Sequence, residues 1–255
     1  MKNDNALISD YLRTNHLHSI SIISPHLDDA AFSLTSFITR VDIPELEVYS
    51  VFTESDKPDS HWSNAMGFES PAEEFSVRRN EDIQAMNMLN VSFTHAGFEA
   101  HSFNAQKAKT IAETILHKKV AEQTLILLPL GAGGQINFLT RLWRRVFKIP
   151  TGCEVHQEHV MVRDLLAGLF SDKLVTIGFY AEFPYLWANN KESFPGFLKN
   201  IYQRNYECFP IPPDVERKFS IARCYKSQFE AEFGTKEYYQ KRTINIPELV
   251  FLPVD

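Results

Sequence analysis

Hydrophobic positions in the first half of the chain alternate between two periods. Short β-branched or almost continuously apolar runs predict strands at 19–24, 46–53, 91–96 and 124–130. Apolar positions at helical spacing predict helices over 28–40, from Ser70–Pro71 to about Asn90, and over 105–120. Strands that alternate with helices form parallel βαβ units with right-handed crossovers. The prediction is a Rossmann-like, three-layer α/β domain with a mainly parallel sheet and its site at the carboxyl ends of the strands.

In the second half of the chain the boundaries between predicted elements are less clearly marked. A helical pattern resumes near His156, a fifth strand is predicted at 174–179, one long helix at 215–233 and a last strand at 249–252. The sequence shows no internal repeat and no Gly/Ser linker, so residues 1–255 are predicted to form one domain. It also has no GxGxxG loop, which weighs against a nucleotide-sugar binder or transferase.

Composition narrows the class of protein. The chain is 44% hydrophobic and 23% charged, has a formal net charge of −6, and its Lys and Arg residues are scattered. We therefore expect neither a nucleic-acid partner nor a membrane span. The first residues lack the apolar core of a signal peptide, and three widely spaced cysteines suit a reducing compartment, so we expect a cytoplasmic protein. The oligomeric state stays open, a homo-oligomer included.

The first candidate for chemistry is Pro25-His26-Leu27-Asp28-Asp29, directly after the first predicted strand. Two carboxylates beside an imidazole are costly to cluster, and a divalent cation would remove that cost. Because neighbouring residues cannot point the same way, one aspartate can bind the metal while the other faces its water. The alternative is a helix cap, with Asp28 or Asp29 accepting backbone N–H bonds.

The second candidate is His156-Gln157-Glu158-His159, at the start of a predicted helix. Histidines three residues apart lie on one helix face, a spacing typical of zinc ligands, although such a pair alone is usually a surface feature. Both motifs follow strands, so they share one edge of the sheet. His26, Asp29 and one of these histidines would leave an open position for water, as in a catalytic zinc site. The same donors accept Fe²⁺.

The two motifs in this order resemble the PIG-L/LmbE-like de-N-acetylases, which are zinc hydrolases that remove acetyl groups from N-acetylglucosamine-type sugars. The resemblance runs from about residue 19 to about residue 230. It is supported by Arg78-Arg79-Asn80-Glu81-Asp82, Gly97-Phe98-Glu99, Leu128-Pro129-Leu130-Gly131, the aromatic segment 179–185 and Tyr225-Lys226-Ser227-Gln228.

The resemblance implies a role for individual residues. His26, Asp29 and His159 would bind the metal, Asp28 would be the general base, and His156 would stabilise the oxyanion and help protonate the leaving amine. Substrate contacts would come from Arg78, Arg79, Glu99 and Tyr180. The implied substrate is a small N-acetylated amino sugar or a conjugate of one.

The chain departs from the family pattern at three places. Glu158 replaces an aspartate, with an expected role in orienting a ligand, and Glu99 replaces a substrate-side aspartate. An insertion of about residues 134–153 separates the fourth predicted strand from His156; in the alternative alignment, 135–138 is a degenerate histidine motif. The alternatives for Arg78 and Arg79 are helix-surface ion pairs, and for Tyr180 packing. The alternative function is a non-catalytic sugar- or metal-binding protein on the same fold.

Overall fold

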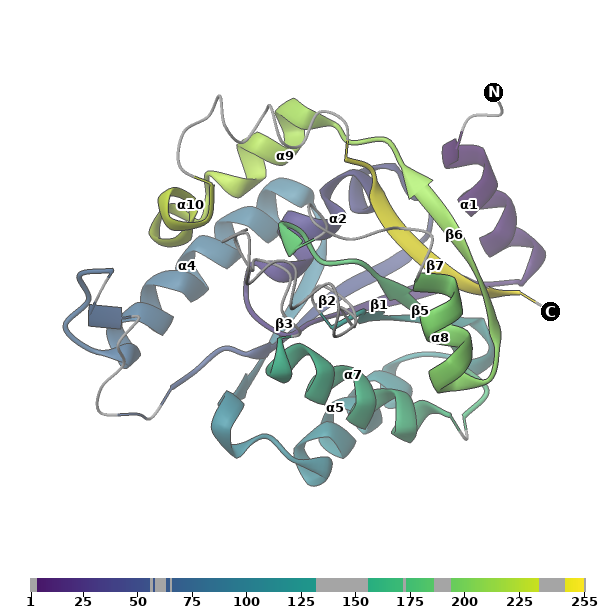
Figure 1. The fold of residues 1–255 in the computed structure, drawn as a ribbon, viewed down its shortest axis with the longest axis horizontal. Helices are drawn as coiled ribbons and strands as arrows, with labels where there is room; N and C mark the ends of the chain where they lie inside the picture. Colours follow the sequence, from purple (N-terminus) through teal and green to yellow (C-terminus); the bar gives the residue numbers. More distant parts are fainter. Residues whose placement is uncertain are drawn as a thin grey trace, which may run out of the picture.

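The structure, a computed structural model, describes residues 4–55, 57, 63–64, 66–131, 156–171, 173–185, 194–233 and 246–254. This part of the chain holds a seven-stranded sheet of order β3-β2-β1-β4-β5-β7-β6 (Figure 1). The strands are β1 (Ser19–Ser24), β2 (Glu45–Phe52), β3 (Ser92–Phe98), β4 (Thr124–Pro129), β5 (Thr176–Tyr180), β6 (Asn205–Ile211) and β7 (Glu248–Val254). The first five pair in parallel, while β7 runs antiparallel to both β5 and β6. The predicted mainly parallel α/β fold is confirmed.

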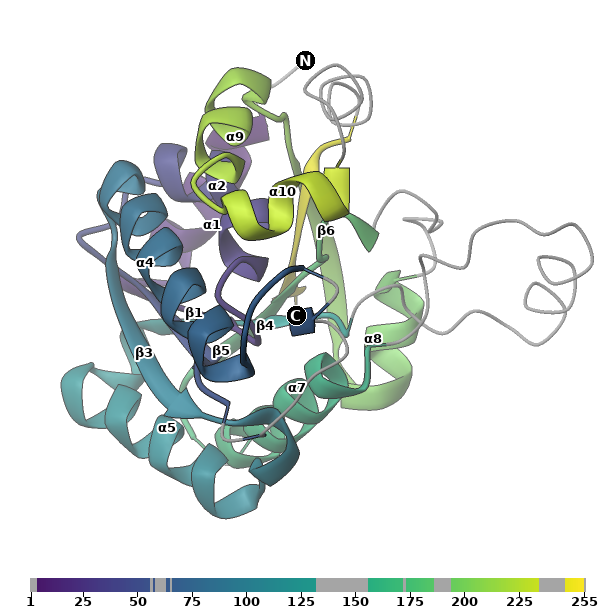
Figure 2. The same cartoon turned by 90° about the vertical axis from the view of Figure 1, so that its left-hand side faces the viewer.

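Helices cover both faces of this sheet, which gives three layers (Figure 2). One face carries α1 (Asp4–Thr14), α2 (Asp29–Arg40), α4 (Pro71–Leu89), α9 (Val215–Ala222) and α10 (Lys226–Phe233); the other carries α5 (Ala105–Lys118), α7 (Gln157–Phe170) and α8 (Phe194–Tyr202). Short 3₁₀ turns lie at Ala100–Ser102 and Ala121–Gln123. The strands alternate between the layers: Leu125 and Leu127 enter the first core, whereas Ile126 and Leu128 enter the second.

The order of the strands fixes where a site can form. From β1 the chain moves outward through β2 to β3, and then returns to the other side of β1 with β4. The carboxyl ends of β1 and β4 therefore flank a topological switch point, where open α/β sheets bind their ligands. The two motifs singled out in the sequence follow these two strands.

The C-terminal part differs from the prediction. The single helix expected over 215–233 is two helices, α9 and α10, separated at Arg223–Tyr225. The backbone N–H groups of Cys224 and Tyr225 bond to Ile221 and Ala222 in a tight turn, and the break carries no Gly or Pro that would have signalled it. Helices α1 and α8 and strand β6 were not predicted either.

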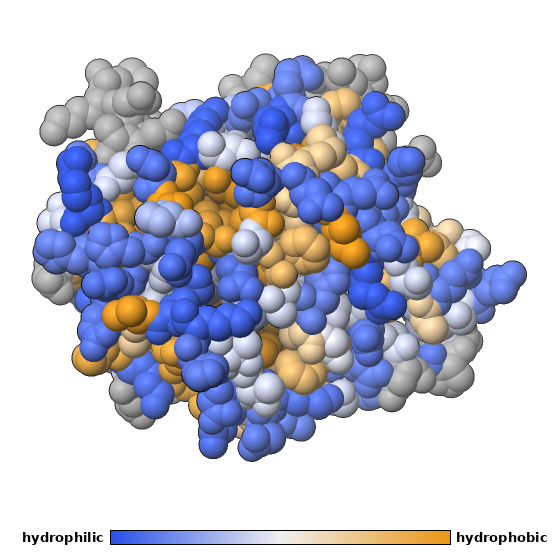
Figure 3. Space-filling view, turned by 180° about the vertical axis from the view of Figure 1, so that it is seen from behind, coloured by the Kyte–Doolittle hydropathy of each residue, from blue (hydrophilic) through white to orange (hydrophobic). Residues whose placement is uncertain are grey.

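The predicted insertion lies outside the described residues. None of the described helices is both long enough and apolar enough to span a membrane. The face turned away in Figure 1 is mostly hydrophilic, with apolar side chains gathered near its middle (Figure 3).

Candidate active site

The loop after β1 is held by its own side chains. Ser24 Oγ donates to the carbonyl of His26 (2.6 Å) and accepts from the N–H of Ala30 (3.0 Å). Asp29 Oδ2 accepts from the N–H of His26 (2.8 Å). Asp28 occupies the N-cap position of α2, but its side chain makes no capping hydrogen bond. The cap interpretation therefore does not account for Asp28, and Asp29 bonds the preceding loop and not the helix.

The second motif begins α7. His156 is the N-cap residue, and His159 lies one turn further and is 1% exposed. His159 Nδ1 lies 3.0 Å from Glu182 Oε1, in the segment after β5. The same carboxylate accepts from the N–H groups of Leu130 (3.0 Å) and Gly131 (2.9 Å) at the end of β4. Glu182 thus ties β4, β5 and α7 together and turns Nε2 of His159 toward the loop after β1.

Gly131 is required where β4 ends. Its φ of +107° is one that L side chains rarely adopt, and a Cβ there would lie 2.8 Å from Arg163 Nη1 and 2.9 Å from Val160 Cγ2. The guanidinium of Arg163 also donates to the carbonyl of Leu130. Arg163 therefore packs directly on the strand end that Glu182 holds.

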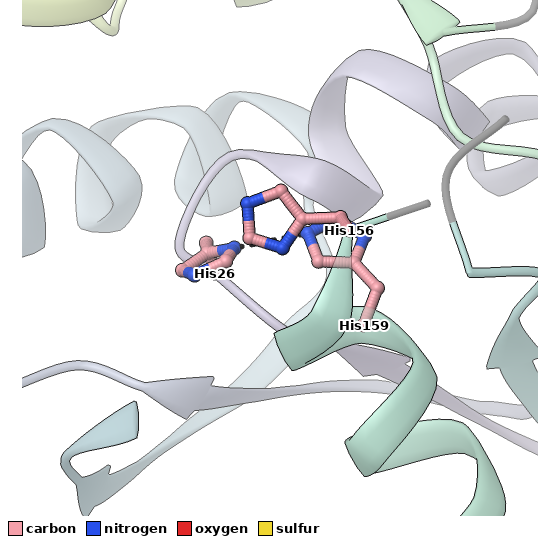
Figure 4. A group of neighbouring side chains, drawn as sticks. All are labelled: His26, His156 and His159. Atoms are coloured by element: carbon pink, nitrogen blue, oxygen red, sulfur yellow. Dashed lines mark hydrogen bonds between the residues drawn. The ribbon is translucent and has the colours of Figure 1, made fainter. Parts of the chain in front are cut away.

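His26, His156 and His159 converge from the loop after β1 and from the start of α7 (Figure 4). Each offers one nitrogen, and the three lie within 4.8 Å of one another. His26 Nδ1 and His159 Nε2 are 3.1 Å apart, and Asp29 Oδ2 lies 3.3 Å from each of them. Three donor atoms thus form a nearly equilateral triangle.

This triangle has the size that a small divalent ion requires. Zinc–nitrogen and zinc–oxygen bonds of about 2.0–2.1 Å at tetrahedral angles place neighbouring donors about 3.3 Å apart. Moreover, Nδ1 of His156 is buried and has no hydrogen-bond partner among the described residues. Two imidazoles and a carboxylate are also the donors that Zn²⁺ and Fe²⁺ prefer. The residues present therefore fit a metal ion.

Glu158 contacts the opposite edge of the His26 ring. Its Oε2 lies 2.7 Å from His26 Nε2. Burial lowers the pKa of His26, but hydrogen bonds with Asp29 and Glu158 outweigh it and raise that pKa to about 9. The bond to His26 likewise lowers the pKa of Glu158. The longer carboxylate at position 158 thus reaches His26 and fixes which of its nitrogens faces Asp29 and His159.

The pKa values of His156 and Asp29 lie below their usual range. Burial lowers the pKa of His156 to about 4, and positive charge on His159 and His26 adds to the effect. Burial raises the pKa of Asp29, yet the attraction of His159 and His26 is stronger and holds it below its usual range. Asp29 is therefore ionised and His156 neutral near pH 7.

A cavity of about 410 Å³ opens over this cluster. Its wall includes Asp28, Arg78 and Glu99, together with aromatic rings from Phe52, Phe75, Phe183 and Tyr185. Arg78 is buried: it donates to Asp28 Oδ1 (3.4 Å) and Glu74 Oε1 (3.2 Å), and its Nε has no partner among the described residues.

Two predicted substrate residues point elsewhere. Arg79 donates to the carbonyl of Thr53 (2.7 Å) at the end of β2 and is not among the lining residues. Tyr180 is fully buried and donates to the carbonyl of Ile23 (2.8 Å) within the sheet. The contact of Tyr180 matches the packing alternative, whereas Arg79 bonds to a main-chain carbonyl and not to the carboxylate that the ion-pair alternative expected. Tyr185, five residues on, faces His156 and His159, with ring centroids 6.5 and 6.1 Å away.

Glu182 is the residue whose role sequence reasoning missed. The sequence offers it only as part of the aromatic segment 179–185, but it is fully enclosed beside His159. The sequence held one signal for this role. Glu182 is an acidic residue just after the buried strand β5, and β5 pairs with β4, the strand that precedes the histidine motif.

Comparisons with known proteins support the fold. No family model and no curated protein matches the chain. Among solved structures, the zinc-inhibited form of teicoplanin deacetylase Orf2 matches with a TM-score of 0.66 and 17% identity over 93% of this chain and 99% of that one. N,N′-diacetylchitobiose deacetylase from Pyrococcus horikoshii matches with 0.51 and 12% over 98% and 91%. GalB, the 4-carboxy-2-hydroxymuconate hydratase from Pseudomonas putida, matches with 0.50 and 13% over 94% and 97%. The fold thus carries more than one reaction class.

Proposed function

We propose that this protein is a metal-dependent hydrolase that removes an N-acetyl or other N-acyl group from an amino sugar or amino-sugar conjugate. One observation carries the proposal. His26 Nδ1, Asp29 Oδ2 and His159 Nε2 form a metal-sized triangle at the wall of a cavity, and the uncapped carboxylate of Asp28 lies beside it.

His26, Asp29 and His159 would hold the ion, with Glu158 and Glu182 orienting the two imidazoles. A divalent ion bound there supplies Lewis acidity toward an amide carbonyl and toward water. The remaining wall is then free to bind and orient the substrate.

We assign the proton transfers to Asp28. Its side chain does not cap α2, and its Oδ1 accepts a hydrogen bond from Arg78 Nη2 at 3.4 Å. In the proposed reaction Asp28 takes a proton from water as the new C–O bond forms. It returns that proton to the nitrogen as the C–N bond breaks, which yields a carboxylic acid and an amine.

We assign stabilisation of the oxyanion to His156. It lines the cavity beside His26 and His159, with ring centroids 5.2 and 4.3 Å away. A neutral imidazole suits hydrogen-bond donation, and Asp28 suffices to protonate the amine.

The cavity favours a sugar as substrate. Aromatic rings and hydrogen-bonding side chains such as Arg78 and Glu99 share its wall, and its volume of about 410 Å³ falls in the range of small-molecule sites. Two of the similar structures bear the names of deacetylases, one of teicoplanin and one of N,N′-diacetylchitobiose. These names support an N-acetylated amino sugar.

The test is acetate release from N-acetylglucosamine and N,N′-diacetylchitobiose by Zn²⁺- or Fe²⁺-loaded protein. We expect turnover by the wild type and a loss of about 10²–10⁴-fold in Asp28→Asn, with metal content unchanged. The exposed Asp10→Asn is the matched control. Binding of either sugar without acetate release would instead establish the non-catalytic binding protein. Equal turnover by Asp28→Asn and wild type would refute the role of Asp28.

A further inference from the structure

Parts of two sequence motifs that the proposed reaction does not use contact each other in the structure. Glu81 and Asp82 lie on α4, and Tyr225 and Ser227 lie where α10 begins. Glu81 accepts from both the N–H (2.9 Å) and the hydroxyl (2.5 Å) of Ser227. Asp82 accepts from the hydroxyl of Tyr225 (2.6 Å). The break between α9 and α10 thus sets Tyr225 against α4.

Asp82 is the centre of a buried hydrogen-bond network. The residue is 0% exposed, and its second oxygen lies 2.7 Å from Nε2 of His95 on the edge strand β3. The same Tyr225 hydroxyl proton is shared, in a bifurcated bond, with the carbonyl oxygen of Leu27 at 3.2 Å. The network therefore runs from the sheet edge to the peptide that joins Leu27 to Asp28.

Tyr225 also contacts helix α2, which follows this loop, through its ring. The ring packs edge-on against Phe32, with centroids 5.2 Å apart, and Phe32 lines the cavity. Both Leu27 and Tyr225 are 0% exposed, so no water replaces these contacts.

Helix α4 contacts Asp28 itself from the same face. Arg78 and Asp82 are four residues apart and so lie one above the other. Arg78 donates to the carboxylate of Asp28, while Asp82, through Tyr225, reaches the preceding carbonyl. One helix thus fixes both the main chain and the side chain at this position.

The candidate metal ligands are held by other groups. His26 contacts Glu158, Asp29 accepts from the N–H of His26, and His159 contacts Glu182. None of these contacts involves α4 or α10. Loss of the Tyr225 hydroxyl should therefore disturb Asp28 while it leaves the metal in place.

We propose that His95, Asp82 and Tyr225 form a positioning network that holds the Leu27–Asp28 peptide and thereby sets the direction of the Asp28 carboxylate. The consequence for catalysis rests on the proposed function, in which Asp28 moves the proton. The positioning of the peptide does not depend on the proposed function, and it can be measured without a substrate.

The substrate-free test compares amide hydrogen exchange of peptides covering residues 25–32 in zinc-loaded wild type, Tyr225→Phe and Tyr11→Phe. Tyr11 is the matched control because its hydroxyl donates to the carbonyl of Pro253, remote from the loop. We expect exchange about fivefold faster in Tyr225→Phe, the factor that one net hydrogen bond contributes, with zinc content unchanged. Wild-type exchange in Tyr225→Phe, or equal acceleration in Tyr11→Phe, would overturn the proposal.

The kinetic test uses acetate release from whichever of the two acetylated sugars the wild type hydrolyses. Tyr225→Phe should lower kcat about fivefold to tenfold and leave KM within twofold, because the substrate wall is intact. Asp82→Asn serves as a second variant should Tyr225→Phe not fold. An unchanged kcat with accelerated exchange would refute the catalytic consequence. A wild type that binds zinc but hydrolyses neither sugar counts against the proposed function, and the exchange result stands on its own.

Discussion

Glu182 offers the sharpest test of how the second histidine is held. Its carboxylate accepts three hydrogen bonds, from Leu130 N (3.0 Å), Gly131 N (2.9 Å) and His159 Nδ1 (3.0 Å). In Glu182→Gln one oxygen becomes an NH₂ donor, which must face at least one of these three donors. The variant therefore loses a charge-assisted bond of about 1.5–3 kcal/mol. The amide NH₂ can turn toward Leu130, whose N–H also bonds to the carbonyl of Tyr180 (2.8 Å).

The effect on metal binding follows from the contact with His159. In Glu182→Gln the His159 ring faces a neutral amide in place of a carboxylate, and carboxylate partners of this kind are worth about 10–100-fold in metal affinity. We expect the Kd for Zn²⁺ of Glu182→Gln to rise by that factor. Competition with a chromophoric zinc chelator measures it directly.

Glu248→Gln is the matched control. Glu248 is 2% exposed and likewise accepts two backbone N–H bonds, from Ser36 (2.9 Å) and Phe37 (2.8 Å). Its third partner is Lys218 and not a histidine. We expect both variants to lose stability in urea unfolding and only Glu182→Gln to lose zinc affinity. Zinc affinity within twofold of wild type in Glu182→Gln, or an equal loss in both variants, would refute the reasoning.

Three further predictions follow from individual contacts. Because His26 has a pKa near 9 without metal, it must release a proton on coordination. Apparent zinc affinity should therefore fall about tenfold per pH unit below 9; a flat titration between pH 6 and 8 would contradict this. Tyr180→Phe should cost about 1 kcal/mol of stability in urea unfolding, whereas a raised KM with full stability would restore its sugar-binding role. Glu158→Ala should weaken zinc binding about tenfold or more, and an unchanged Kd would refute its orienting role.

The sequence predicted the N-terminal half of the fold, where the hydrophobic periodicity and the residues that begin or end elements indicate the same boundaries. Strands β1 and β4 are β-branched or apolar runs with clear ends, and α4 begins at Ser70–Pro71 as expected, with Ser70 Oγ accepting from Glu73 N. The split of 215–233 carries no such signal, because the break is stabilised by the contact of Tyr225 with Asp82, 143 residues away.

The site residues likewise fall into those that local sequence patterns reveal and those that depend on distant contacts. His26, Asp28, Asp29, His156 and His159 were found because their spacing after strands is a local feature of the sequence. Glu182 and Tyr225 contact His159 and the carbonyl of Leu27, which are distant in the sequence. Only the folded arrangement of the strands brings these partners together. Arg79 and Tyr180 show the converse: a residue beside a motif can turn away from the site, here toward the carbonyls of Thr53 and Ile23.

The central claim is that His26, Asp29 and His159 hold a catalytic metal, and metal content per chain tests it most directly. Wild type, His159→Ala and His95→Ala would be purified without added metal, confirmed as folded by circular dichroism, and analysed by elemental mass spectrometry. We expect about one zinc or iron per chain in wild type and in His95→Ala, and none in His159→Ala. Equal metal in all three, or a folded wild type that also refuses added zinc, would contradict it.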